Sequence, residues 1–365
     1  MPASTQTPSR GFNLIGYATS PMGLGEDLRS FAAMLEYLMI NFSVIDIPTD
    51  VQGLVKVGWS HLTQVDYKTS IFFMSPIECQ KLADLHPQLF SKPEKKIGYF
   101  LWELPDFPAE QANALQLVDQ IWCPTRFVQE VFFKTSRRLT LSLPLPVVQH
   151  TTANIDFRAL LQIPPKAFVV LFVFDARSTM QRKNPQATLR VFMEFAKAHP
   201  DAYLILKISR WENIKDSSLS WIPALPNIKV IQQTLSPQEL SSLYSASDCY
   251  LSLHRSEGFG RTLVEALQHG LYLVTTDFSG PKDFLTPDNA CLVSWNKTTA
   301  KAGDYPKLTQ DSWWAEPDEG QAVTQLSLAK KKAKVSRNQV GIEDGKRFSF
   351  EALASKYLPI IKTYL

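Results

Sequence analysis

Short apolar segments alternate with amphipathic helical stretches along nearly the whole chain. This alternation is typical of parallel α/β sheets, in which helices connect buried strands. The predicted strands of the first half are Phe12–Tyr17, Phe42–Ile47, Ser70–Ser75, Lys96–Glu103 and Gln120–Pro124. Those of the second half are Phe168–Asp175, Ala202–Ser209, Asn227–Gln233, Cys249–His254, Leu271–Thr276 and Cys291–Trp295.

Helices are indicated by spacing and by a capping motif. After the first predicted strand, one apolar stripe has helical spacing: Leu28, Phe31, Ala32, Leu35 and Leu38. The segment Ser236–Glu239 is a capping box with proline at the first helical position. Its expected buried face is Leu240, Leu243 and Tyr244.

The stretch from Leu143 to about Arg158 has little regular pattern, so we place a domain boundary there. The sequence predicts an α/β protein of two Rossmann-like domains, 1–150 and 151–345, that face a cleft. Residues 346–365 are expected to form a C-terminal helix, and packing back on the first domain is one arrangement for it. Ligands of such sheets bind beyond the carboxyl ends of the strands. Functional residues should therefore lie in the loops that leave the strands.

Composition and charge exclude several classes of protein. With 45% hydrophobic and 20% charged residues, the chain fits neither a disordered protein nor a membrane bundle. The net charge of +3 is too small to indicate nucleic acid as a partner. The longest apolar run, Phe168–Phe174, is too short to span a bilayer, and the first ten residues contain no hydrophobic signal segment. We therefore expect a cytoplasmic protein.

Cysteines and basic segments carry weaker signals. The cysteines lie far apart without metal-ligand spacing, so we expect buried free thiols at Cys79, Cys123, Cys249 and Cys291. The run Lys330–Lys334 is expected to be a solvated helix face, with contact to an anionic surface as the alternative. In Thr125–Arg138, core packing explains most of the aromatic residues, and a peripheral membrane contact is the alternative.

The segment Ser252–Gly270 runs from a predicted strand through a glycine loop into a predicted helix. Gly258 and Gly260 allow a sharp turn, and the helix start at Arg261 and Thr262 offers unpaired N–H groups to a phosphate. Alone, this pattern fits an ordinary tight turn.

Two carboxylates indicate a ligand site rather than an ordinary turn. Glu257 lies in the loop and Glu265 one to two turns into the helix, so both can face one ligand across the helix start. Carboxylates accept hydrogen bonds from sugar hydroxyls, which are uncharged donors. We therefore predict a nucleotide-sugar site here.

The Glu257-x7-Glu265 pattern, inside Ser-Glu-Gly-Phe-Gly and Val-Glu-Ala, resembles the signature of family-4 retaining glycosyltransferases, which have the GT-B fold. The resemblance extends across most of the chain. Further blocks resemble the bacterial polysaccharide and lipopolysaccharide branch of that family: Gly23–Glu26, Gly98–Pro105, Val118–Pro124, Arg182–Pro185 and Trp314–Asp318. These blocks do not specify the sugar.

The resemblance implies roles for individual residues. Glu257 would contact hydroxyls of the donor sugar, and Glu265 would hold the ribose. Arg177 and Lys183 match the family's cations that bind the diphosphate, and they would stabilise the leaving group as a metal does elsewhere. No metal and no cofactor besides the donor are therefore expected. The remaining nucleotide-binding positions are Gly23, Gly25, Gly258, Phe259, Gly260, Arg261 and Thr262.

Three other readings of single residues stay open. Glu103, at the end of a predicted strand, is a candidate for polarising the acceptor or supporting developing positive charge, and a structural salt bridge fits equally well. His254 is expected to brace the loop rather than to catalyse. Arg182 and Lys183 could instead only solvate a helix start.

The implied reaction is transfer of a hexose from a nucleotide diphosphate sugar to a saccharide or lipid-linked saccharide acceptor, with retention of configuration. A leaving phosphate oxygen would take the acceptor proton. A non-catalytic nucleotide- or saccharide-binding subunit of a larger complex is one alternative, and a GT-B-like epimerase or phosphorylase is another. For a lipid-linked acceptor, the inner face of the cytoplasmic membrane is the alternative location.

Overall fold

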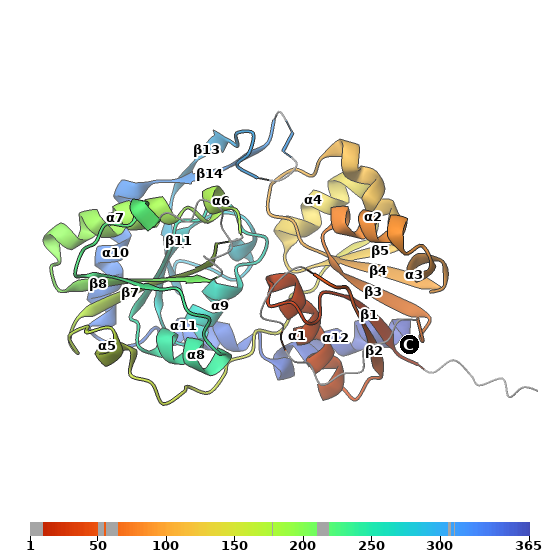
Figure 1. The fold of residues 1–365 in the computed structure, drawn as a ribbon, viewed down its shortest axis with the longest axis horizontal. Coiled ribbons are helices and arrows are strands. Elements are labelled where there is room, and N and C mark those ends of the chain that lie inside the picture. Colours follow the sequence, from red (N-terminus) through yellow and green to blue (C-terminus); the bar gives the residue numbers. More distant parts are fainter. Residues whose placement is uncertain are drawn as a thin grey trace, which may run out of the picture. The chain divides into compact units, whose positions relative to one another are not determined.

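The computed structural model describes residues 10–49, 55, 65–176, 178–209, 219–305, 308–309 and 311–365. The chain divides into two compact units. Unit 1 comprises Met1–Val148 and Phe348–Leu365, and unit 2 comprises Gln149–Arg347. The last segment of the chain thus belongs to the same unit as the first half, and each unit has its own sheet (Figure 1).

Unit 1 contains a parallel six-stranded sheet in the order β2-β1-β3-β4-β5-β6. Its strands are β1 (Phe12–Gly16), β2 (Phe42–Asp46), β3 (Thr69–Met74), β4 (Lys95–Phe100), β5 (Gln120–Cys123) and β6 (Thr140–Ser142). Its helices are α1 (Gly23–Tyr37), α2 (Pro76–Leu85), α3 (Gln88–Ser91), α4 (Arg126–Ser136) and α12 (Phe350–Ile361), with 3-10 turns η1 (Ala109–Leu117) and η5 (Lys362–Tyr364).

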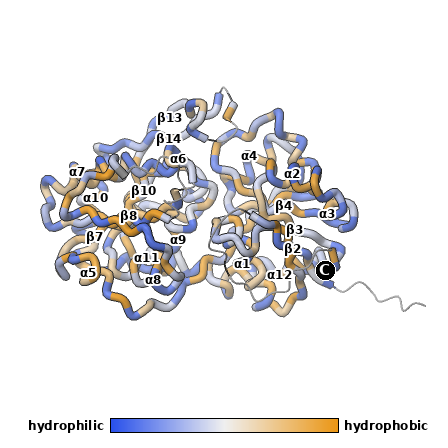
Figure 2. The backbone as a smooth tube through the Cα atoms, viewed as in Figure 1, coloured by the Kyte–Doolittle hydropathy of each residue, from blue (hydrophilic) through white to orange (hydrophobic). Residues whose placement is uncertain are grey.

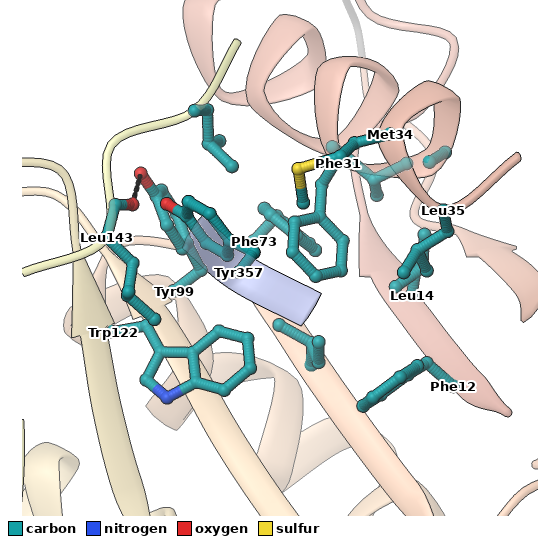
Figure 3. Close-up of a cluster of buried hydrophobic side chains, with 14 of the residues drawn as sticks. Phe12, Leu14, Phe31, Met34, Leu35, Phe73, Tyr99, Trp122, Leu143 and Tyr357 are labelled. Atoms are coloured by element: carbon teal, nitrogen blue, oxygen red, sulfur yellow. Dashed lines mark hydrogen bonds between the residues drawn. The ribbon is translucent and has the colours of Figure 1, made fainter. Parts of the chain in front are cut away.

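The C-terminal helix α12 completes the core of unit 1. Its side chains Leu353, Tyr357 and Ile361 are buried in the same cluster as Phe31 of α1 and Trp122 of β5. The Tyr357 hydroxyl donates a hydrogen bond to the Pro144 carbonyl. In Figure 3 Tyr357 lies among aromatic side chains from α1 and the sheet. Core packing therefore holds the expected C-terminal helix on the sheet of unit 1.

Unit 2 contains a second parallel six-stranded sheet in the order β12-β11-β10-β7-β8-β9. Its strands are β7 (Phe168–Asp175), β8 (Ala202–Ser209), β9 (Ile228–Ile231), β10 (Cys249–Ser252), β11 (Tyr272–Thr276) and β12 (Ala290–Val293). Its helices are α5 (Phe157–Leu160), α6 (Met180–Lys183), α7 (Pro185–Ala198), α8 (Pro237–Ser245), α9 (Arg261–Gln268), α10 (Glu319–Ala333) and α11 (Gln339–Lys346), with 3-10 turns η3 (Leu219–Trp221) and η4 (Gly280–Asp283). The predicted α/β class is confirmed, and Figure 2 shows β7 and β8 as hydrophobic strands.

Each predicted strand is present, but three strands were not predicted. One is the short β6, and the others are β13 (Trp295–Thr299) and β14 (Trp313–Pro317), which form an antiparallel hairpin. The hairpin is paired with neither large sheet, so the polar residues of β13 stay exposed and the strand lacks the apolar run of a buried strand.

The local helix signals are confirmed, except that the expected buried residues Leu38 and Leu240 are only half-buried. The stripe residues Leu28, Phe31, Ala32 and Leu35 are all buried in α1. Helix α8 begins with the expected capping box, in which Ser236 and Glu239 each accept a hydrogen bond from the other's backbone N–H. The four cysteines are buried free thiols. Within the described ranges, the helices are all too short or too polar to cross a membrane.

Contrary to the expectation from the sequence, the run Lys330–Lys334 is not solvated along its whole length. Lys330 is only 4% exposed, because its side chain turns inward, pairs with Asp201 and lies 6.0 Å from the Phe168 and Phe195 ring centroids. The expected solvated face is therefore wrong for Lys330. It follows Ala322 and Leu326 at four-residue intervals, so it lies on the buried stripe of α10.

Candidate functional site

The loop that follows β10 forms the centre of the candidate site in unit 2. Strand β10 lies inside the sheet between β11 and β7, and its carboxyl end leads through residues 253–260 into helix α9. Gly260 caps α9 in the left-handed region with φ +90°, which glycine adopts without steric cost. The predicted glycine turn and helix start are therefore present. Helix α9 begins at Arg261, and the N-terminus of a helix carries a partial positive charge.

The loop that follows β11 packs against this turn. The Glu257 N–H donates to Ser279 Oγ at 2.8 Å, and the Gly280 N–H donates to the Glu257 carbonyl at 2.9 Å. A Cβ on Gly280 would lie 2.1 Å from the Gly258 carbonyl oxygen, so only glycine allows this approach. Sequence reasoning missed Ser279 and Gly280. The available signal was the Ser-Gly-Pro turn that directly follows β11.

Glu257 is the most strongly held carboxylate of the site. Its residue is 8% exposed, and its two carboxylate oxygens are paired with different cations. Lys183 Nζ lies 2.5 Å from Oε1, and an Arg182 guanidinium nitrogen lies 3.0 Å from Oε2. Burial opposes the charged form, but Lys183 and Arg182 outweigh it and lower the pKa of Glu257 to about 2. Glu257 is therefore an anion at neutral pH.

The two cations come from a short segment between β7 and α7. Helix α6 ends at Lys183, and Asn184 then takes the left-handed conformation before Pro185 starts α7. Arg182 also donates to the Ser256 carbonyl at 2.9 Å. The alternative that both cations only solvate a helix start is wrong, since Arg182 is buried and both side chains reach Glu257. The predicted Arg177 lies outside the described residues.

Glu265 lies one turn inside α9, half-buried, on the same helix whose start follows Glu257. Its Oε2 accepts a hydrogen bond from the Tyr244 hydroxyl at 2.7 Å. Between the two glutamates, Phe259 is buried with its ring 5.7 Å from that of Phe284, and Thr262 is half-buried. The structure thus brings together the predicted residues Lys183, Glu257 to Thr262 and Glu265 in one unit.

His254 lies at the end of β10, fully buried. Its Nε2 is 3.4 Å from the Phe278 carbonyl oxygen, and its Nδ1 lies near the hydroxyls of Ser252 and Thr275. Burial lowers the pKa of His254 to about 4, so the ring is neutral at pH 7. A neutral ring that donates from Nε2 and accepts at Nδ1 matches these partners. The geometry fits a bracing role between β10 and the loop after β11.

Arg255 connects the loop to the hairpin. Its guanidinium pairs with both carboxylate oxygens of Glu316 at 2.6 and 3.0 Å and lies 5.5 Å from the Trp314 ring centroid. Its backbone N–H donates to the Arg182 carbonyl, and its own carbonyl accepts from Ala315. The block Trp314–Asp318 therefore contacts the loop that carries Glu257.

The remaining predicted residues belong to unit 1. Helix α1 begins at Gly23, where an added Cβ would meet nothing within 4 Å. At Gly25 a Cβ would lie 2.3 Å from the Ser20 carbonyl oxygen and 2.5 Å from that of Tyr17, so that glycine is needed for packing. Glu103 lies in a loop, because β4 ends at Phe100 rather than at the predicted position 103. It is half-buried there.

Within the described residues, no group of three or more His, Cys, Asp or Glu side chains could hold a metal ion.

Comparisons with known proteins agree with this geometry. The family model "Glycosyl transferases group 1" matches residues 156–305, which contain the β10–α9 loop and α6. A protein of Sulfolobus islandicus filamentous virus (isolate Iceland/Hveragerdi) named "Putative glycosyltransferase 45" is 25% identical over 252 residues. That match spans 66% of this chain and 66% of the viral protein, just under two thirds of each.

Solved structures show the same fold over nearly the whole chain. Sucrose-phosphate synthase from Thermosynechococcus elongatus superposes with a TM-score of 0.71 at 13% identity, covering 97% of this chain and 98% of that one. The E. coli trehalose-6-phosphate protein bound with UDP-2-fluoro glucose gives 0.64 at 10% identity, covering 97% and 99%. These neighbours are GT-B glycosyltransferases, and this chain has the GT-B fold.

Proposed function

We propose that this chain, a glycosyltransferase of the GT-B fold, moves a hexose from a nucleoside diphosphate sugar to a hydroxyl of a saccharide acceptor. The observation that carries the proposal is the ionised Glu257, paired with Lys183 and Arg182 beside the N-terminus of α9. A carboxylate suits sugar hydroxyls, whereas cations and a helix N-terminus suit phosphates. A nucleoside diphosphate sugar contains both sugar hydroxyls and phosphates. The group 1 family match supports the same reaction class.

The roles follow from the chemistry of each group. Glu257 accepts hydrogen bonds from hydroxyls of the donor sugar, and Glu265 accepts those of the ribose. When the donor binds, the Lys183 ammonium leaves Glu257 and pairs with the diphosphate. Its flexible side chain allows this movement. Arg182 then keeps Glu257 paired and ionised. Arg177 is proposed as a further diphosphate ligand, and charge stabilisation by these side chains makes the reaction independent of a divalent metal.

Unit 1 is proposed to bind the acceptor. The open space around Gly23 fits close approach of a substrate to the backbone, and Glu103 is the candidate for polarising the acceptor hydroxyl. A lipid-linked acceptor is part of this proposal, because α4 exposes Phe133 beside Lys134, whereas its neighbour Phe132 belongs to the core. The non-catalytic subunit is not favoured, since the two glutamates and Lys183 are all in place.

The first test is a panel of nucleoside diphosphates followed by a transfer assay. A ligand at 100 times its Kd stabilises the folded chain by about 2.7 kcal/mol, so thermal shifts with UDP, GDP, ADP and dTDP identify the base. UDP is the first choice because the E. coli neighbour is bound with a UDP sugar. With the matching nucleotide sugar, the purified chain is expected to transfer or hydrolyse the donor equally with and without EDTA. If EDTA abolishes activity and Mg²⁺ or Mn²⁺ restores it, the metal-independent reaction is wrong.

The stereochemistry of the product tests the proposed retention of configuration. Inversion needs a general base behind the sugar, opposite the leaving group. The two cations described beside Glu257 instead fit attack from the leaving-group face, in which a phosphate oxygen takes the proton of the acceptor hydroxyl. NMR of the product from an α-configured donor is expected to show an α linkage. A β linkage would contradict retention and make Glu103 the candidate base.

A further inference from the structure

Tyr244 connects the interior of unit 2 to the carboxylate of Glu265. It lies in the last turn of α8, is 1% exposed, and donates its hydroxyl hydrogen bond to Glu265 Oε2 at 2.7 Å. A residue with so little exposed surface has no face to offer a ligand. Tyr244 therefore acts on a ligand only through its neighbours, and its shorter polar contact is the one with Glu265, since the Thr262 carbonyl oxygen lies 3.5 Å from the same hydroxyl.

The tyrosine ring is held by two neighbouring rings. It is stacked with the rings of Tyr250 and His269, whose centroids lie at 6.1 and 5.2 Å. His269 in turn has its Nδ1 2.7 Å from the Glu265 carbonyl and its Nε2 2.8 Å from Ser241 of α8. The aromatic stack therefore joins α8 to the Glu265 turn of α9, and the Tyr244 hydroxyl lies 2.7 Å from Glu265 Oε2 and 3.5 Å from the Thr262 carbonyl oxygen.

The hydroxyl can only act as a donor toward this carboxylate. Burial, and then the nearby Glu265 charge, raise the pKa of Tyr244, so the phenol is protonated at neutral pH. A hydrogen bond to a charged acceptor is stronger and more directional than one between neutral groups. The carboxylate plane of Glu265 is thereby held in one orientation.

We propose that Tyr244 is a positioning residue that orients the Glu265 carboxylate toward the ribose hydroxyls of the donor, and that it thereby sets the preference for ribonucleotides over 2′-deoxyribonucleotides. The inference rests on the proposed function, in which Glu265 binds the ribose. A carboxylate has about four acceptor positions, so it can accept hydrogen bonds from a tyrosine hydroxyl and from adjacent ribose hydroxyls at the same time. Their simultaneous donation requires a fixed carboxylate plane.

Isothermal titration calorimetry tests this with matched nucleotide pairs: UDP with 2′-deoxy-UDP, GDP with 2′-deoxy-GDP, and ADP with 2′-deoxy-ADP. The wild-type chain and the Tyr244→Phe variant are compared for the pair that binds. The control is Tyr99→Phe, which removes a buried hydroxyl that donates to the Leu143 carbonyl in unit 1. Thermal unfolding of all three chains checks that the variants are folded.

In the wild type, the ribonucleotide is expected to bind about 10- to 100-fold more tightly than its deoxy partner, because the deoxy partner leaves a charged acceptor without one hydrogen bond. Tyr244→Phe is expected to lower this ratio at least threefold while changing the deoxynucleotide affinity by less than twofold. Tyr99→Phe is expected to leave the ratio unchanged. General damage to the site would instead weaken both nucleotides equally.

The failures are distinguishable. If no ribonucleotide binds the wild type, the proposed donor site is wrong, and the role of Tyr244 falls with it. If the wild type prefers the ribonucleotide but Tyr244→Phe keeps the full ratio, only the positioning role is overturned. A wild-type ratio near one would remove Glu265 from the ribose contact and would overturn the inference as well.

Discussion

Replacing Glu257 with alanine is expected to reduce sugar transfer by more than tenfold while nucleoside diphosphate binding changes only a few-fold. In the proposed function Glu257 contacts the donor through hydroxyls of the sugar, and a nucleoside diphosphate has no hexose. A lost hydrogen bond to a charged group is worth about 1.5–3 kcal/mol, which corresponds to a factor of about ten or more. The measurements are kcat/KM for the donor and the Kd of the nucleoside diphosphate, each for the wild type and for the variant.

The matched control for this variant is Glu194→Ala. Glu194 is an exposed carboxylate of α7 that pairs with Lys197, away from the β10–α9 loop. Its removal should leave transfer unchanged. Retention of more than about a tenth of wild-type transfer by Glu257→Ala would contradict the sugar contact. An equal loss of transfer and of diphosphate binding would indicate a collapsed loop instead.

The low pKa of Glu257 adds a dependence on pH. Because the pKa falls from 4.5 to about 2 on folding, the ionised pair stabilises the folded chain fully above about pH 4.5. That contribution is lost as the pH falls through 2. The stability advantage of the wild type over Glu257→Gln should therefore be constant between pH 6 and 8 and shrink below pH 4.5. Glu257 should produce no inflection in the pH profile of transfer near neutrality.

The strands could be predicted where burial leaves a mark on the sequence. Strands β7 and β8 are covered on both faces, so each is an almost unbroken apolar run with the predicted ends. The hairpin of β13 and β14 lies outside both large sheets, and its polar residues follow no such run. Lys330 shows a second limit, since its partner Asp201 is 129 residues away along the chain.

The candidate site also contains residues that the local sequence predicts and residues that only tertiary contacts bring in. Glu257 and Glu265 are separated by seven residues, so the turn and helix between them place both from local sequence alone. Ser279 and Gly280 come from the loop after the next strand, β11, and meet the β10–α9 loop only after folding. Arg182 was part of a recognised block, yet its pairing with Glu257 depends on how α6 lies over the carboxyl end of β10. Tertiary contacts of this kind leave no periodic signal.

Replacing Lys183 or Arg182 with alanine is expected to separate ligand binding from stability. Lys183 is 18% exposed at its side chain and Arg182 only 4%, so Lys183 is the one of the two that we propose as the ligand of the diphosphate. Lys183→Ala should weaken diphosphate binding by about 10- to 100-fold and slow transfer, because a charged hydrogen bond to the phosphates is lost. Its unfolding temperature should stay near that of the wild type, since Arg182 still pairs with Glu257.

Arg182→Ala should act mainly on folding. It removes the donor to the Ser256 carbonyl and the more buried of the two partners of Glu257, which keeps Lys183, and a hydrogen bond that involves a charged group is worth about 1.5–3 kcal/mol. The control is Lys197→Ala, which breaks an exposed pair on α7 and should change neither property. Calorimetric unfolding and diphosphate titration of the three variants decide the outcome. If Lys183→Ala binds the diphosphate as tightly as the wild type, then Lys183 only neutralises Glu257, and the cation for the leaving group must be sought elsewhere.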